Sequence, residues 1–302
     1  MTAQHLKEGL IVKAQSGFFS VETGEGLIVC QLRGKLKRGR ATGDIAALGD
    51  RVRIKALPDH SGVIEEVLAR QSAITRLDPR PQGVYQQVLL ANPDQALFVF
   101  ACAEPEPRLR MLDRFLVIAE KQKIPAIVVA NKIDLVGDER AREIFELYEY
   151  PGYKVLYTSA VTGDGLEDFQ EALKGKISAL AGPSGAGKSS LLNAIQPGLG
   201  LEVHALSAVN KGHHTTVVRQ LFPLPGRGYV ADTPGWKSLA LWDTQPEELD
   251  AYFPEIAPLV SQCQFSDCTH THEPGCAVRA AMEAGRLHPE RYTSYIRMRM
   301  GK

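Results

Sequence analysis

The sequence predicts a multidomain protein with an N-terminal all-β barrel, a central α/β domain and a C-terminal, mainly helical region. Three observations predict this division. Short strand-like runs fill residues 1–72, near-continuous apolar runs alternate with helical patterns over 73–241, and a Cys/His cluster lies within 242–302. With 302 residues, of which 44% are hydrophobic, the chain is long enough to bury several cores.

The first region has the pattern of a small closed barrel. Residues 9–23, 26–34, 49–57 and 62–68 are short β-branched or aromatic runs that Gly, Asp and Pro separate. Four or five strands within about seventy residues are typical of an OB-type barrel. The following stretch, 74–83 (ITRLDPRPQG), is interpreted as a linker.

The central region has the pattern of a doubly wound α/β sheet. Buried parallel strands read as unbroken apolar runs, as in DQALFVFACA and AIVVANKID, with KVLYTSA and KISALAG as further strands. Amphipathic helical patterns alternate with them, over 109–122, 139–150 and 165–175.

The chain carries no targeting signal that we recognise. Its N-terminus lacks the basic start, apolar middle and small cleavage site of a signal peptide, and no apolar run is long enough for a membrane span. We therefore expect a cytoplasmic protein without a membrane partner. In that compartment the five cysteines are expected to stay reduced.

The run GPSGAGKS, from Gly182 to Ser189, matches the phosphate-binding loop G-x-x-x-x-G-K-[ST]. Its glycines let the backbone curl so that N–H groups face phosphate oxygens, and the following helix adds its positive N-terminal end. Lys188 is expected to neutralise the β- and γ-phosphates, and Ser189 to offer its hydroxyl to Mg²⁺. A mere Gly-rich turn would not explain the strand before it and the helix after it. The expected phosphate contacts are Gly182, Pro183, Ser184, Gly185, Ala186, Gly187, Lys188, Ser189 and Ser190.

Two further segments follow the phosphate loop in the chain, where segments that sense the nucleotide are expected. Asp232 ends a strand-like run and is expected to hold Mg²⁺, and Gly235 of the D-T-P-G turn can bring an N–H near the γ-phosphate. The segment NKGHHTTVV, between the phosphate loop and Asp232, has the position of a mobile switch. Both Thr215 and Thr216 are predicted to contact GTP. Either threonine could complete the Mg²⁺ shell. Thr216 is the metal ligand that we predict, and Thr215 remains the alternative.

A base-reading segment precedes the phosphate loop. Asn131, Lys132, Ile133 and Asp134 form N-K-I-D. The carboxylate of Asp134 can accept bonds from guanine N1–H and the 2-amino group, neither of which adenine offers, so the site should select GTP over ATP. Ser159 and Ala160 end the next strand, where a backbone N–H can meet guanine O6. The alternative for N-K-x-D, a solvated helix start, would not explain why the pieces coexist at strand ends.

The C-terminal region contains a metal-binding pattern. Cys263, Cys268 and Cys276 lie around two histidines, His270 and His272, in CQFSDCTHTHEPGC. Three thiolates and one imidazole form the closed tetrahedral set that structural Zn²⁺ prefers. Reduced buried cysteines or a disulfide are the alternatives. We expect one structural zinc ion with no open position for catalysis.

The order of these elements is reversed relative to most GTP-binding domains, because the base-reading segment precedes the phosphate loop. With the barrel, KGHHTT, DTPGW and the cysteine pattern, nearly the whole chain resembles the circularly permuted small-ribosomal-subunit-dependent GTPase A family. The resemblance implies an OB barrel, slow hydrolysis of GTP to GDP stimulated by the small subunit, and a role late in that subunit's maturation. It also places the fourth zinc ligand at His270. One departure is Trp236, where Phe is common.

The resemblance also bears on catalysis and partners. Trp236 stands where many GTPases have a water-orienting Gln, and the family pattern K-G-x-H-T-T favours His214 over His213 as the catalytic group. The basic run 33–40 holds five basic residues and no acid, and the resemblance implies ribosomal RNA as its target rather than plain solvent. Arg291, Arg297, Arg299 and Lys302 are further expected phosphate contacts. We expect a monomer. The alternatives are a GTP-sensing RNA-binding module that acts on another ribonucleoprotein and whose hydrolysis is incidental, and a GTPase serving some other ribonucleoprotein or signalling partner.

Overall fold

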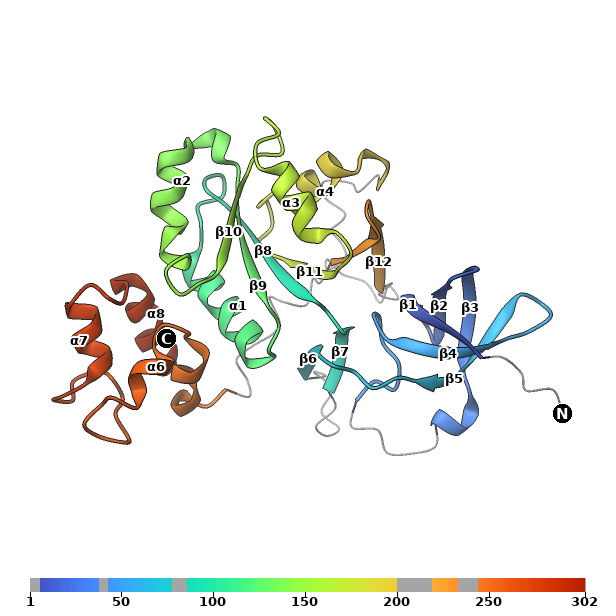
Figure 1. Cartoon of the computed structure of the whole chain (residues 1–302), viewed down its shortest axis with the longest axis horizontal. Coiled ribbons are helices and arrows are strands. Elements are labelled where there is room, and N and C mark those ends of the chain that lie inside the picture. The colour runs from blue at the N-terminus through green and yellow to red at the C-terminus, as the bar shows by residue number, and fades with distance from the viewer. Residues whose placement is uncertain (1–5, 38–42, 78–85, 200–218, 233–243, 302) are drawn as a thin grey trace.

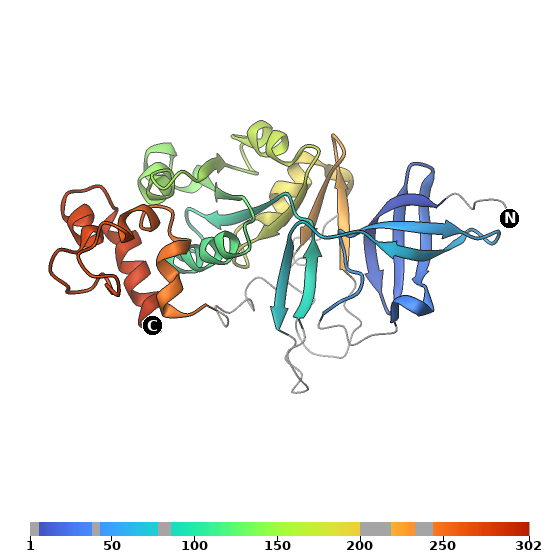
Figure 2. The ribbon, with the colours of Figure 1, turned by 60° about the horizontal axis from the view of Figure 1, so that its bottom comes forward.

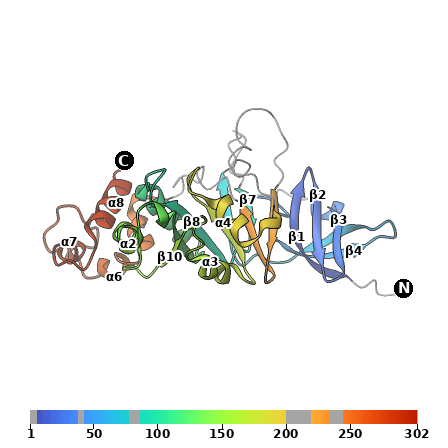
Figure 3. The same cartoon turned by 90° about the horizontal axis from the view of Figure 1, so that it is seen from above.

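The structure, a computed structural model, describes residues 6–37, 43–77, 86–199, 219–232 and 244–301. The chain is elongated, with the barrel at one end, the α/β sheet in the middle and the C-terminal helices at the other end (Figure 1). Two turned views show the same order along the long axis (Figures 2 and 3). The predicted fold class is confirmed by this arrangement. Within the described ranges, no helix combines the length and apolar character needed to cross a bilayer.

Five strands form the N-terminal barrel. They are β1 (Lys7–Gln15), β2 (Phe18–Thr23), β3 (Gly26–Leu32), β4 (Arg51–Ala56) and β5 (Ser61–Val67). The order is β1-β2-β3-β5-β4, and pairing of β4 with β1 closes the barrel. All neighbours are antiparallel except β3 and β5. Inward residues such as Ile11, Val21 and Ile54 are fully buried, because alternate side chains of a strand point to one face. A short helix, η1 (Gly34–Lys37), follows β3.

The prediction of a linker over residues 74–83 is partly wrong. Residues 73–77 form strand β6 (Ala73–Leu77), which pairs antiparallel with β7 (Gln86–Ala91) in a small separate sheet. Ile74 is fully buried in the same core as the central domain. The Asp, Pro and Gly residues that indicated a linker begin after this strand, and residues 78–85 lie outside the described residues.

The central sheet has the order β10-β9-β8-β11-β13-β12. Its strands are β8 (Gln95–Ala101), β9 (Ala126–Asn131), β10 (Lys154–Thr158), β11 (Ile177–Ala181), β12 (Arg219–Leu224) and β13 (Gly228–Asp232). All are parallel except β12, which also pairs with β1 and so joins the sheet to the barrel. Sequence analysis did not predict β12.

Helices cover both faces of this sheet, which explains the unbroken apolar strands. Helices α1 (Leu109–Lys121) and α2 (Asp138–Phe145) share one core with Phe98 and Phe100 of β8. Helices α3 (Leu166–Leu173) and α4 (Lys188–Ile195) share the other with Leu97 and Val99. Single-turn helices are η2 (Ile133–Leu135), η3 (Glu146–Tyr148) and η4 (Pro197–Leu199).

The C-terminal region packs on helix α1 of the central domain. Its elements are η6 (Pro246–Tyr252), α6 (Ala257–Val260), α7 (Ala277–Glu283) and α8 (Pro289–Arg299). Val117 of α1 belongs to the same hydrophobic cluster as Phe253, Leu287 and Tyr295. The region therefore completes its core with a helix from the preceding domain.

Arg291 corrects one sequence expectation. Its side chain is 1% exposed and pairs with Asp113 of α1 and with Glu255, at 2.5 and 2.6 Å. A guanidinium enclosed in this way has no free face for an RNA phosphate. Arg291 therefore joins the C-terminal region to α1 rather than serving as a phosphate contact.

Candidate nucleotide and metal sites

The predicted nucleotide-binding segments meet at one edge of the central sheet. In the parallel registers, Asn131 at the end of β9 lies opposite Thr158 of β10 and Ala101 of β8. Leu180 of β11 lies opposite Asp232 of β13. The carboxyl ends of these strands thus converge, which is where open α/β sheets bind their ligands.

The loop after β11 has a backbone that only glycine can adopt at its critical positions. Gly182, Gly185 and Gly187 have φ angles of 153°, 82° and 92°. A Cβ at Gly182 would lie 2.0 Å from the carbonyl oxygen of Val99, and one at Gly187 would lie 2.2 Å from Nδ2 of Asn131. The loop is consequently packed against β8 and β9, in the curled conformation by which glycine-rich loops direct backbone N–H groups at a phosphate.

Lys188 and Ser189 begin helix α4 directly after this loop. The ammonium of Lys188 donates to the backbone carbonyls of Gly182 and Pro183, at 3.0 and 2.9 Å, so it curls back over the loop. Ser189 lies in the first helical turn and is only 5% exposed. A cation and a hydroxyl thus lie beside the positive end of a helix, an arrangement suited to a polyphosphate with its metal ion.

Asn131 connects the base-reading segment to the phosphate loop. It is 1% exposed, its Nδ2 donates to the carbonyl of Ala186 at 2.8 Å, and its Oδ1 accepts from the Thr158 hydroxyl at 3.1 Å. The side-chain nitrogen and oxygen of Asn131 both have hydrogen-bond partners within the protein, so Asn131 has a structural role between β9, β10 and the loop. Sequence analysis placed Asn131 in the site without identifying these contacts.

Lys132 and Asp134 follow in a turn that exposes Asp134. Lys132 has a left-handed φ of 64°, and its ammonium donates to the carbonyl of Glu104. One oxygen of Asp134 accepts from the Ser159 hydroxyl at 2.6 Å. Ser159 Oγ in turn accepts from the backbone N–H groups of Val161 and Thr162, at 3.2 and 3.1 Å. This chain of hydrogen bonds fixes the carboxylate of Asp134 and leaves its other oxygen available to accept a hydrogen bond from a nucleobase.

The remaining predicted residues are described only in part. His214, Thr215, Thr216 and Gly235 lie outside the described residues, and so does the side chain of Asp232. Ala160 follows Ser159 at the end of β10 and is partly buried.

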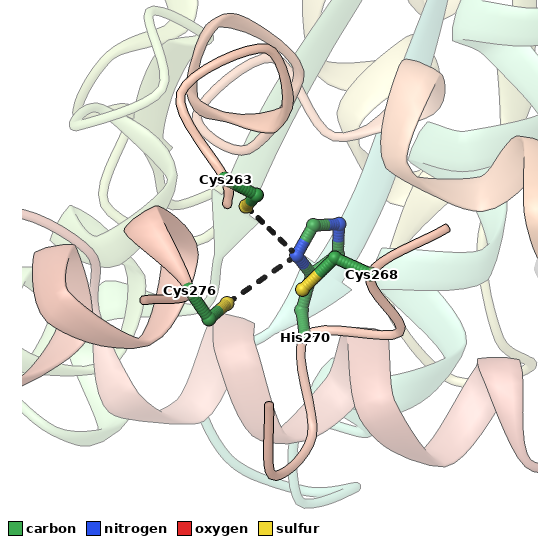
Figure 4. Close-up of side chains that lie close together, drawn as sticks. All are labelled: Cys263, Cys268, His270 and Cys276. Atoms are coloured by element: carbon green, nitrogen blue, oxygen red, sulfur yellow. Dashed lines mark hydrogen bonds between the residues drawn. The ribbon is translucent and has the colours of Figure 1, made fainter. Parts of the chain in front are cut away.

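Four side chains of the C-terminal region form a compact cluster that could hold a metal ion. One ligand atom from each of Cys263, Cys268, His270 and Cys276 lies within 4.8 Å of the others (Figure 4). Nδ1 of His270 is 3.5 Å from the sulfur of Cys263 and 3.4 Å from that of Cys276. Tetrahedral Zn²⁺, with bonds of about 2.3 Å to sulfur and about 2.0 Å to nitrogen, sets S and N roughly 3.5 Å apart. The donor set and spacing therefore fit zinc.

The loop that carries these ligands is ordered by a carboxylate. Glu273 accepts from the backbone N–H groups of Thr269, Thr271 and His272, at 2.8, 3.0 and 3.1 Å. Desolvation opposes the effect, yet hydrogen bonds from the Thr269 hydroxyl and from backbone N–H groups, those of Thr269 and His272 among them, hold the pKa of Glu273 below its ordinary value. The sequence pattern gave no sign of this role.

The ring of His270 is oriented from both sides. It is fully buried, its Nδ1 faces the sulfurs, and its Nε2 lies 3.8 Å from Oδ2 of Asp250. Metal-bound histidines commonly direct the second ring nitrogen at a carboxylate in this way. His272, the rival ligand, is exposed and contacts the hydroxyl of Thr271 instead.

Family models match two parts of the chain. The model described as RsgA GTPase matches residues 67–242, and the model described as RsgA N-terminal domain matches residues 8–64. The chain belongs to the RsgA GTPase family.

Full-length relatives support this assignment. The small ribosomal subunit biogenesis GTPase RsgA of Gemmatimonas aurantiaca is 46% identical over 296 residues, covering 96% of each chain. The protein of the same name from Moorella thermoacetica is 42% identical, covering 96% of this chain and 95% of the relative. Among solved structures, YjeQ from Thermotoga maritima has a TM-score of 0.81 at 39% identity, covering 98% of each chain. YloQ, described as a circularly permuted GTPase, has a TM-score of 0.77 at 34% identity, covering 100% of this chain and 96% of that one.

These comparisons confirm the GTPase interpretation of the sequence. As an RsgA-family member with circularly permuted GTPase neighbours, the chain is a GTP-hydrolysing enzyme. The permutation also accounts for the position of N-K-I-D before the phosphate loop, while parallel pairing still brings both to one sheet edge.

Proposed function

We propose that the chain hydrolyses GTP during late maturation of the small ribosomal subunit, and that the subunit stimulates a slow intrinsic reaction. The observation that carries the proposal is the hydrogen bond between Asn131 and the carbonyl of Ala186. It joins a guanine-type segment and a phosphate-type loop into one site. The names of the full-length relatives supply the ribosomal context.

The phosphate end of the proposed site is the loop from Gly182 to Ser190. Its N–H groups bind phosphate oxygens, and Lys188 exchanges its two carbonyl contacts for the β- and γ-phosphates, which are stronger acceptors because they are charged. The bound Mg²⁺ supplies neutralisation of charge on the transferred phosphoryl group. The residues proposed to hold it are Ser189, Asp232 and Thr216, with Thr215 and Gly235 close to the γ-phosphate.

The base end is formed by Asp134 with Ser159 and Ala160. Because Ser159 occupies one carboxylate oxygen, it orients the Asp134 side chain toward the guanine edge. Backbone groups at Ser159 and Ala160 are proposed to receive O6. Ile133 is 6% exposed and anchors the segment in the core. We propose His214 as the group that orients the attacking water.

The C-terminal cluster is proposed to hold one structural Zn²⁺. The four ligands come from the α6–α7 loop and the start of α7, so the ion would fix a segment that has little core of its own. All four positions are filled by protein, which leaves the ion no place for a substrate.

We propose that residues 1–72 form an RNA-binding OB domain, 73–241 the permuted GTPase domain and 242–302 the zinc domain. The basic run 33–40 supports an RNA contact, although Arg33 pairs with Glu65 and residues 38–42 lie outside the described residues. The full chain is proposed to act as a monomer in the cytoplasm, where its ribosomal partner is assembled.

Two measurements test this function. GTP turnover is measured with and without purified small subunits, and the chain is cosedimented with each subunit in the presence of a non-hydrolysable GTP analogue. Stimulated turnover and selective pelleting with the small subunit are expected. Unstimulated turnover would favour a GTP-sensing RNA-binding module, and pelleting with neither subunit would exclude the ribosomal role.

A further inference from the structure

A cavity lies where helix α8 of the C-terminal region packs beside the start of helix α1. Its volume is about 700 Å³, and both helices contribute to its walls. The two helices lie at the junction between the central domain and the C-terminal region in Figure 1. A volume of this size lies within the range of pockets that bind small organic molecules. Its described lining includes no residue of the phosphate loop and no residue of the Cys/His cluster.

The cavity has apolar walls, and the charged residues among its described lining are arginines. Met111, Phe115 and Met298 provide apolar surface. Arg108, Arg110, Arg114 and Arg297 line the same cavity and are exposed, and among the described lining residues there is no carboxylate.

These arginines lack neutralising partners in the described part of the chain, where none of the four forms an ion pair. The nearby carboxylate of Asp113 is buried and is already paired with Arg291. The guanidinium charge at this surface is therefore available to a ligand.

Helix α1 begins with positively charged residues, although the N-terminus is the positive end of the helix dipole. Its N-cap is Arg108, which makes no capping hydrogen bond, its first turn contains no acid, and Arg110 lies in that turn. A cation at a helix N-terminus is unfavourable by about 0.3–1 kcal/mol, because the exposed N–H groups are already positive. An anion bound there would be favoured by the helix end and the arginines together.

We propose that this cavity binds single-stranded RNA, with an unstacked base between α1 and α8 and the adjoining phosphates on the arginines. Guanidinium groups form forked bonds to phosphate and stack on base faces, which lysines do not. RNA offers repeated negative charge and flat apolar faces in one chain, matching arginines around an apolar cavity. The partner is the RNA of the proposed ribosomal function, on which this inference rests.

The proposed RNA site depends on the docking of the C-terminal region. Ser294, Arg297 and Met298 come from α8, whereas the other lining residues precede or belong to α1. The buried pairing of Arg291 with Asp113 fixes these helices side by side. RNA bound in the cavity would contact the GTPase domain and the C-terminal region at once.

The first test locates RNA on the full chain. A 12-nucleotide single-stranded RNA containing 4-thiouridine is crosslinked by light, and the modified peptides are identified. We expect crosslinks within 107–115 and 294–298. Their absence, while crosslinks form elsewhere on the chain, overturns the inference. A poly-glutamate peptide of equal charge that prevents these crosslinks as well as unlabelled RNA does would overturn it in favour of an acidic protein partner.

The second test uses Arg110→Gln with Arg114→Gln and follows affinity for the same RNA against salt concentration. Losing two phosphate contacts should reduce the slope of log K against log salt by about 1.4, or roughly 25-fold in affinity at 0.1 M salt. Arg110→Lys with Arg114→Lys should retain the slope but bind several-fold more weakly, because charge is kept and stacking is lost. The matched control is Arg140→Gln, on the exposed side of α2, which should leave both quantities unchanged.

These outcomes separate the inference from the proposed function. If the wild-type chain pellets with small subunits but neither its crosslinks nor its salt slope involves the cavity, only the inference fails. If the chain pellets with no subunit, the proposed function fails whatever the oligonucleotide does.

Discussion

The substitution Arg291→Ala tests whether one buried guanidinium holds the C-terminal region on the GTPase domain. Nη1 of Arg291 is 2.5 Å from Asp113 and Nε is 2.6 Å from Glu255. The guanidinium also lies over the rings of Phe253 and Tyr148, 4.7 and 5.4 Å from their centroids. Burial alone would lower the pKa of Arg291, but the two carboxylates raise it above its ordinary value, so the group is charged throughout the accessible pH range.

Removing this cation would leave two buried carboxylates without a counter-charge. Asp113 is 3% exposed and, among the described residues, would keep the hydrogen bond from the Tyr148 hydroxyl, at 3.1 Å. Breaking a buried pair at one partner costs about 3–5 kcal/mol. We expect a loss of this size in the free energy of opening of α8, a large share of the 5–15 kcal/mol that stabilises a typical domain.

Native-state hydrogen exchange of the α8 amides measures this opening without assuming that the whole chain unfolds in one step. Exchange should accelerate by roughly two to four orders of magnitude, since each 1.36 kcal/mol corresponds to about tenfold. The control Arg279→Ala removes a partly exposed arginine whose pair with Glu283 is 3.6 Å long, and should cost at most about 0.5 kcal/mol.

A second variant separates charge from packing. Replacing Arg291, Asp113 and Glu255 together by Met, Leu and Met should recover much of the loss, because no charge is then left buried and unpaired. A loss below about 1 kcal/mol for Arg291→Ala, or one equal to that of Arg279→Ala, would refute the reasoning.

Four further predictions concern the nucleotide and metal sites. Asp134→Asn should lose GTP and gain XTP in a binding titration, because the amide donates where the carboxylate accepts; unchanged GTP affinity would remove Asp134 from the base pocket. Gly187→Ala should weaken GTP binding at least tenfold by calorimetry, since its Cβ would lie 2.2 Å from Asn131 Nδ2; wild-type affinity would contradict the packing described. Cys268→Ala should reduce zinc from one equivalent to almost none by elemental analysis and destabilise the C-terminal region, and a metal-free wild type with that region folded would argue against a zinc site. His214→Ala should bind GTP normally but lose most subunit-stimulated turnover, and equal stimulated rates would rule out its catalytic role.

The sequence by itself determined the chemistry that short segments carry. GPSGAGKS, N-K-I-D and the Cys/His pattern each need particular residue types at fixed spacings, so their local geometry is readable before any fold is known. The apolar strands and amphipathic helices were also predictable, because both faces of the central sheet are buried. The order of segments further indicated the permutation that the comparisons support.

Only the tertiary structure decided how distant segments meet. Strand β6 was missed because its five residues carry too little periodicity next to a Pro-rich stretch. Arg291 resembled an exposed RNA contact, since a basic terminal sequence does not reveal that Asp113 and Glu255 enclose it. The bond from Asn131 to the phosphate loop and the arginine-lined cavity likewise join residues far apart in the chain. Such contacts depend on how strands and helices pack, and the local residue pattern does not determine that packing.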